Sequence, residues 1–96
     1  MNIARDASAI YRKSRNVDET RIGDRIVLYH RDSGNGIVLN PSGTIMWDTL
    51  ASPKSAAELR EKLLSRFAGT DLARVTDDVD SYLASLMSQR LLIAEE

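Results

Sequence analysis

The sequence predicts an α+β domain similar to a winged helix-turn-helix, with a three-stranded antiparallel sheet followed by three α-helices. Two observations lead to this prediction. The first half of the chain holds short runs of β-branched and aromatic residues separated by glycine-containing turns. The second half holds segments in which apolar residues recur three and four positions apart. Because three short strands cannot bury a core alone, we expect the helices to cover the sheet.

Length and composition narrow the range of functions. The 96 residues fit one domain, in which we expect residues 1–16 to form a loosely ordered arm and residues 17–96 to form the folded unit. The absence of cysteine excludes disulfides, thiolate nucleophiles and cysteine-ligated metals, and the single histidine argues against a histidine metal site. The net charge of −1 lacks the basic excess of a nucleic-acid binder.

The chain carries no apolar run near the ~18 residues of a membrane-spanning helix. Its first residues also lack a hydrophobic signal region. We therefore expect a cytoplasmic protein with no membrane partner.

The strands are expected in the first forty residues. Residues 25–30 read Arg-Ile-Val-Leu-Tyr-His, a composition typical of a strand. The turn residues Gly34-Asn35-Gly36 can supply positive φ angles, and the run 37–39 then returns as the second arm of a β-hairpin. A shorter strand over about 17–22 precedes the hairpin, with Gly23-Asp24 as the connecting turn.

The first two helices have recognisable starts. Pro41, within Asn40-Pro41-Ser42-Gly43, cannot donate to a sheet but suits the first turn of a short helix, which Ser52-Pro53 closes. Ser55 and Glu58 form a capping box for a second helix over about 55–67.

The third helix has the clearest amphipathic pattern. Thr70 or Asp71 can cap its start. Its apolar stripe consists of Leu72, Val75, Val79, Tyr82, Leu83 and Leu86. The residues Leu91-Leu92-Ile93 then form a short apolar tail that we expect to pack back on the core.

Residues with catalytic or metal-binding potential occur in patterns typical of structural roles. His30 lies two residues from Asp32, but no Gly-x-Ser-x-Gly elbow is present, which favours a turn or edge-strand histidine. The aspartates at 77, 78 and 80 lack the spacing of a calcium loop and suit the start of a helix. The glycines at 34, 36 and 43 lack the spacing of a phosphate-binding loop. We therefore expect no catalytic residue, no metal site and no cofactor.

The strand Gly36–Asn40 comes last among the expected strands, beside the third helix. Its outer edge would then expose unpaired N–H and C=O groups, and such an edge can accept another strand. The added strand could belong to a peptide, which would receive main-chain hydrogen bonds from Ile37, Val38 and Leu39. It could also belong to a second copy of the chain, giving a homodimer.

The segment Leu39–Leu50, which reads Leu-Asn-Pro-Ser-Gly-Thr-Ile-Met-Trp-Asp-Thr-Leu, resembles the central signature of the coenzyme PQQ synthesis protein D family. The resemblance extends over about residues 17–93. Its further elements are Ala57-Glu58-Leu59 with Leu63 and Phe67, then Asp78-Val79, Tyr82-Leu83, Leu86 and Leu91-Leu92. Arg90 departs from the pattern, because the family usually has glycine before the Leu-Leu pair. This departure predicts either a different helix end or a strained left-handed cap.

The resemblance implies a RiPP recognition element, a non-catalytic peptide chaperone that binds the leader of a ribosomally made precursor in natural product biosynthesis. In such domains the leader adds as a strand to the third β-strand, in a groove beside the third helix. The tailoring enzyme, such as a radical SAM protein or a leader peptidase, is a separate partner. The peptide-binding residues expected on this basis are Gly36, Ile37, Val38, Leu39, Asp78, Val79, Tyr82, Leu83 and Leu86.

Two other functions remain open. A winged-helix DNA-binding module has the same order of elements, but the third helix carries no Lys or Arg between Val75 and Gln89. A toxin–antitoxin module or another protein-interaction module would also have this size. Neither alternative explains the Leu39–Leu50 signature.

Overall fold

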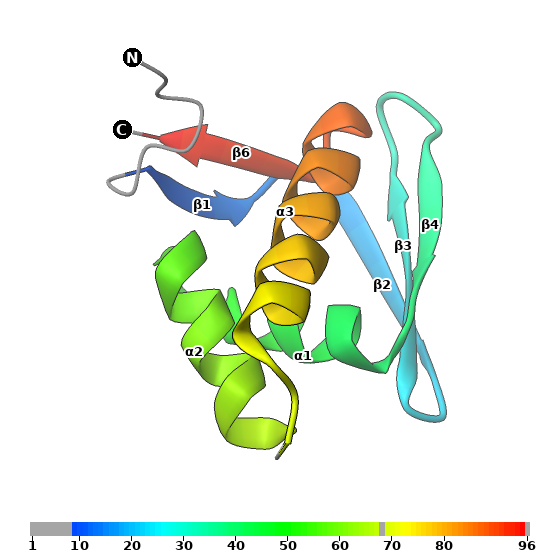
Figure 1. Ribbon diagram of the computed structural model, residues 1–96. Helices are drawn as coiled ribbons and strands as arrows, with labels where there is room; N and C mark the ends of the chain where they lie inside the picture. The colour runs from blue at the N-terminus through cyan, green and yellow to red at the C-terminus, as the bar shows by residue number, and fades with distance from the viewer. Residues whose placement is uncertain (1–8, 68, 96) are drawn as a thin grey trace.

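The computed structural model describes residues 9–67 and 69–95, which fold into two small antiparallel sheets and three helices (Figure 1). The α+β class is therefore confirmed. The expectation of a single sheet is wrong, because a second three-stranded sheet joins the two ends of the described chain.

The first sheet has the order β2-β3-β4 and consists of the three expected strands. They are β2 (Val17–Ile22), β3 (Arg25–His30) and β4 (Gly36–Leu39). Gly23 and Gly34 both have positive φ angles, as the two connecting turns require. No other described strand pairs with the outer edge of β4.

The three helices follow, and the caps of α2 and α3 are among those that the sequence predicts. They are α1 (Pro41–Thr49), α2 (Ala56–Arg66) and α3 (Leu72–Ser88). The Asn40 side chain accepts a hydrogen bond from the Gly43 N–H at 2.8 Å, which ends β4 and starts α1 without a loop. The capping box between Ser55 and Glu58 is formed in both directions. Asp71 caps α3 by accepting from the Arg74 N–H.

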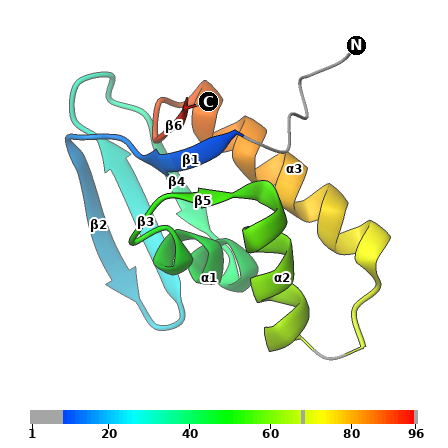
Figure 2. The same ribbon diagram turned by 90° about the vertical axis from the view of Figure 1, so that its left-hand side faces the viewer.

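The second sheet has the order β5-β1-β6, and the sequence predicts none of its strands. β1 (Ile10–Lys13) lies in the segment expected to be a loosely ordered arm, and β6 (Leu92–Glu95) includes part of the apolar tail. The short β5 (Lys54–Ser55) pairs with the other side of β1 (Figure 2). β1 is ordered because its four residues all pair with β6, and Arg12 forms an ion pair of 2.6 Å with Glu95. Residues 1–8 of the expected arm lie outside the described residues.

The core lies between the β2-β3-β4 sheet and the helices. Ile26 and Leu28 of β3 point inward and are fully buried, in agreement with the alternation of strand side chains. Trp47 of α1 packs among them, and the apolar stripe of α3 covers the cluster. Leu91 and Leu92 are also buried in this region, as expected for the tail.

Arg90 ends α3 in the left-handed conformation, with a φ angle of 64°. The Leu91 N–H donates to the Leu86 carbonyl at 2.8 Å, and the Arg90 N–H donates to the Met87 carbonyl at 3.0 Å. These two bonds form a Schellman motif, in which glycine is the preferred left-handed residue. Of the two outcomes that the departure at Arg90 predicts, the structure has the strained left-handed cap.

The Arg90→Gly variant is therefore expected to be more stable than the parent. Glycine adopts positive φ without a Cβ penalty, so we expect a gain of about 0.5–1 kcal/mol. In a domain of this size that gain raises the melting temperature by roughly 2–8 °C. Thermal unfolding followed by circular dichroism measures the shift. Arg90→Ala is the control, since alanine retains the Cβ, and an equal gain in both variants would contradict the explanation.

Candidate functional site

A hollow of about 420 Å³ separates β4 from α3 and is named here the β4–α3 groove. It brings together six of the nine predicted peptide-binding residues: Ile37, Val38, Leu39, Asp78, Tyr82 and Leu86. Residues of α1, among them Gly43 and Met46, also line it, shortly after the Asn40 cap. Because α1 follows β4 without a loop, residues of β4, α1 and α3 line one continuous groove.

Three predicted residues do not line the groove. Val79 and Leu83 are 0% and 5% exposed and belong to the hydrophobic core. Gly36 lies at the start of β4, outside the hollow. The apolar stripe of α3 is therefore mostly core, and its edge alone reaches the groove.

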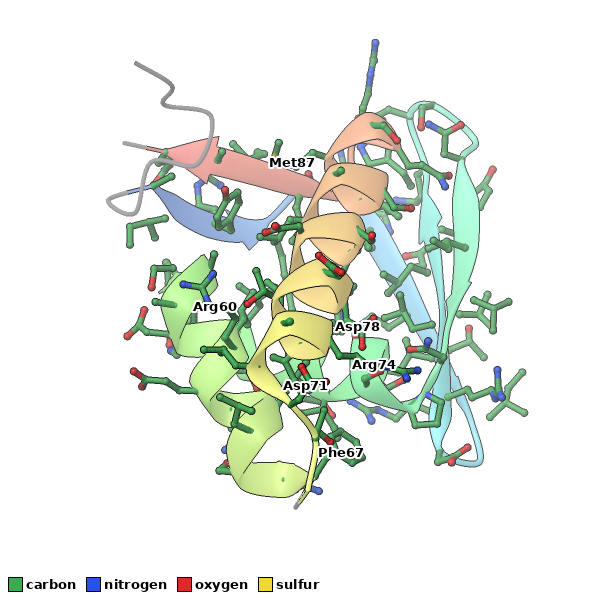
Figure 3. All side chains as sticks on the ribbon, viewed as in Figure 1. Arg60, Phe67, Asp71, Arg74, Asp78 and Met87 are labelled. Atoms are coloured by element: carbon green, nitrogen blue, oxygen red, sulfur yellow. The ribbon has the colours of Figure 1, made fainter. Side chains whose placement is uncertain are left out.

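The predicted Asp78 belongs to a line of polar residues on α3 whose other three members the sequence does not single out. Arg74, Asp78, Ser81 and Ser85 all line the groove. Their separations of four, three and four residues place them on one face of the helix, beside the apolar stripe. The spacing can be read from the sequence, but the apolar periodicity of the helix does not reveal it because these residues are polar. Figure 3 shows Arg74 and Asp78 on the side of α3 that faces the β2-β3-β4 sheet.

The main-chain groups of β4 alternate between β3 and the open edge. The His30 N–H donates to the Asn35 carbonyl at 2.8 Å, and the register continues with Leu28 opposite Ile37. In an antiparallel ladder, hydrogen-bonded and non-hydrogen-bonded pairs alternate. The N–H and C=O groups of Ile37 and Leu39 therefore point to β3. Those of Gly36 and Val38 point to the open edge.

The other side of β3 supports the same alternation. There the Arg31 N–H donates to the Asn16 carbonyl at 2.9 Å, so β3 bonds β2 through the residues that do not bond β4. The expected main-chain contributions of Ile37 and Leu39 are thus already used within the sheet. Their side chains line the groove, whereas Val38 offers its main chain to the edge and is 58% exposed.

Tyr82 forms part of the groove wall while being almost entirely buried. Among the described residues, its hydroxyl finds no hydrogen-bond partner. Burial, with a smaller contribution from the charge of Asp48, raises the pKa of Tyr82 far above its ordinary value. The hydroxyl therefore stays neutral, and Tyr82 contributes to the groove wall as an uncharged aromatic side chain.

The Tyr82→Phe variant should consequently fold as well as the parent. Removing a buried hydroxyl that lacks a partner also removes its desolvation cost of about 1–3 kcal/mol. We expect an unchanged or higher urea midpoint in equilibrium unfolding. A fall of the free energy of unfolding by more than ~1 kcal/mol would mean that the hydroxyl forms a stabilising hydrogen bond.

His30 has a structural role in the turn after β3. Its ring is buried, and its Nδ1 accepts a hydrogen bond from the Ser33 N–H at 3.2 Å. The Asp32 carboxylate accepts instead from the Asn16 side chain at 2.9 Å. Within residues 9–67 and 69–95, no three His, Asp or Glu side chains gather in a way that could hold a metal ion.

None of the three described helices combines the length and the apolar character needed to traverse a bilayer.

Comparison with known proteins gives two matches to this arrangement. The model of the family described as coenzyme PQQ synthesis protein D (PqqD) matches residues 25–92, which include β3, β4 and all three helices. The solved structure described as TbiB1 in complex with the TbiA(beta) leader peptide superposes with a TM-score of 0.75 at 26% sequence identity. That alignment covers 84% of this chain and 93% of the other. No curated protein matches the sequence significantly.

Proposed function

Because this chain belongs to the coenzyme PQQ synthesis protein D family, we propose that it is a RiPP recognition element. In this role it binds the leader of a ribosomally synthesised precursor peptide and presents the precursor to a tailoring enzyme. The observation that carries the proposal is the open edge of β4 beside the β4–α3 groove. The structurally similar TbiB1 was solved with a leader peptide bound, which supports the same class of ligand.

The proposed binding begins with strand addition. Gly36 and Val38 offer two N–H and two C=O groups to an incoming strand. Each hydrogen bond contributes about 0.5–1.5 kcal/mol net, so four of them contribute roughly 2–6 kcal/mol before the cost of ordering the peptide. A micromolar complex needs about 8 kcal/mol. Main-chain pairing alone therefore does not reach micromolar affinity, and additional contacts are needed.

Those additional contacts come from the groove walls. Ile37, Met46, Tyr82 and Leu86 present apolar surface there. One or two buried leader side chains, each contributing ~1.5–3 kcal/mol, would bring the total to the micromolar range. The polar line at Ser81 and Ser85 would select among leaders. In this scheme the main chain provides affinity that tolerates sequence variation, and α3 provides specificity.

The proposal includes no catalytic step for this chain. The chemistry would belong to a separate tailoring enzyme, such as a radical SAM protein or a leader peptidase. The same open edge could pair two copies of the chain, in which case a leader would compete with the homodimer.

Fluorescence anisotropy tests the proposal directly. The probe is a labelled synthetic peptide that spans the leader of a short precursor open reading frame found beside this gene by sequencing its surroundings, and a scrambled peptide of equal composition serves as the control. We expect saturable binding with a Kd of about 1 µM or below for the leader alone. Double-stranded DNA and heparin should not compete, since α3 lacks basic residues along its middle. Equal binding of both peptides, or displacement by DNA, would contradict the proposal.

A further inference from the structure

A second hollow of about 430 Å³ adjoins the β4–α3 groove at the start of α3 and is named here the α2–α3 hollow. The two share Ser42, Arg74 and Asp78 as lining residues. The groove therefore does not stop where β4 ends but continues past the start of α1 toward the end of α2. Figure 3 shows Phe67 below Arg74 and Asp78, at the end of this path.

The α2–α3 hollow has an apolar side. Leu63 of α2 and Val75 of α3 are buried and form its base. Phe67, the C-cap residue of α2, lines the hollow while the residue stays 37% exposed. When another apolar group covers a large apolar side chain that is partly open to solvent, the free energy of the system falls. This side of the hollow therefore suits an aliphatic or aromatic side chain.

The rest of the hollow is negatively charged. It contains the carboxylates of Asp71 and Asp78 against the single guanidinium of Arg74. Asp71 is engaged as the cap of α3. In the described part of the chain, neither Arg74 nor Asp78 forms a salt bridge. A cationic group entering beside Asp78 would thus meet an attractive field.

We propose that the leader continues from its β4-paired segment into the α2–α3 hollow, where an apolar residue packs on Phe67 and a neighbouring Lys or Arg pairs with Asp78. The inference rests on the proposed function, and it defines the substrate class as a leader with two separate recognition segments. One segment forms a strand and is bound largely through its main chain. The other is an apolar–basic pair bound through its side chains. The continuity of the two hollows through Ser42, Arg74 and Asp78 is what joins the segments.

Selection from an mRNA-displayed library of random peptides tests the inference independently of the natural leader. Peptides of roughly 20 residues are long enough to cross both hollows as an extended chain. The full chain serves as bait. Peptides that also bind the edge variant Val38→Pro are discarded in a counter-selection, because they do not depend on the edge of β4. We expect the enriched peptides to carry a β-prone segment and, at a fixed distance, an apolar residue next to Lys or Arg.

Two variants of the hollow and one matched control complete the experiment. Phe67→Ser should bind the enriched peptides about ten-fold more weakly, which is the effect of losing partial burial of one apolar side chain. Asp78→Lys should select acidic residues in place of basic ones. Met87→Ser should bind like the parent, because Met87 is similarly exposed, at 40%, but lies at the other end of α3 (Figure 3).

The outcomes separate this inference from the proposed function. If Phe67→Ser and Asp78→Lys bind the enriched peptides as the parent does, while Val38→Pro does not, the extension into the α2–α3 hollow is refuted and strand addition stands. If no peptide depends on the edge of β4, strand addition fails and the extension fails with it. Circular dichroism spectra of each variant ensure that a loss of binding is not a loss of fold.

Discussion

Replacement of Trp47 by alanine is expected to remove a large share of the protein's stability. Trp47 is 1% exposed and sits on α1 within the core, and the Lys13 Nζ of β1 lies 4.5 Å from the centre of its ring. The side chain therefore joins the core to the second sheet. Large-to-small substitution of a buried tryptophan costs about 3–5 kcal/mol. The total stability of a domain of 96 residues is only about 5–14 kcal/mol.

Thermal and urea unfolding followed by circular dichroism measure this effect. A loss of 3–5 kcal/mol corresponds to a fall of the melting temperature by roughly 12–40 °C in a domain of this size. Tyr29→Ala is the control, because Tyr29 is also aromatic but lies on the solvent-facing side of β3. Cooperative melting of Trp47→Ala within a few degrees of the parent would mean that α1 is packed differently.

The Val38→Pro variant is expected to lose leader binding while keeping the fold. By the alternation of the ladder, the Val38 N–H points to the open edge, so proline removes a donor that the protein itself does not use. The φ angle that proline imposes is compatible with an edge strand, and the bonds of Ile37 and Leu39 to β3 remain. The loss of one donor and the steric block of the pyrrolidine ring should weaken binding of the leader more than 100-fold, about 2.7 kcal/mol.

Val38→Thr is the matched control for this prediction. Threonine keeps the main-chain N–H and the β-branched shape, so leader binding should stay within a factor of about three of the parent. Anisotropy titrations compare the three proteins, and their circular dichroism spectra establish that β4 is retained. If proline at this position leaves the Kd unchanged in a folded protein, the leader does not pair with β4.

The first sheet and the helices could be predicted because local sequence determines them. Gly34-Asn35-Gly36 forces a hairpin turn, and the Ser55–Glu58 box marks a helix start, whatever lies elsewhere in the chain. β1 could not be predicted in this way. Its sequence Ile-Tyr-Arg-Lys is half charged, and its main partner β6 lies about 80 residues away in the sequence. Strand formation there depends on pairing and not on an intrinsic pattern.

The candidate site was predictable in outline but not in detail. An edge beside an amphipathic helix follows from the order of the elements, and the structure retains both. The apolar stripe of α3 does not by itself distinguish groove from core, and Val79 and Leu83 lie in the core. The polar line from Arg74 to Ser85 becomes meaningful only once β4 lies opposite to it. Which main-chain groups reach the edge depends on the hydrogen-bond alternation, which the sequence does not determine.

Amide hydrogen exchange of β4, measured by NMR with and without the leader peptide, tests strand addition most directly. In the free protein, the amides of Ile37 and Leu39 should be protected by β3, while those of Gly36 and Val38 should exchange freely. On saturation with leader, Gly36 and Val38 should become protected, and the chemical shifts of the groove face of α3 should change. Shift changes concentrated in residues 11–15, with Gly36 and Val38 still exchanging freely, would contradict strand addition and indicate an electrostatic partner instead.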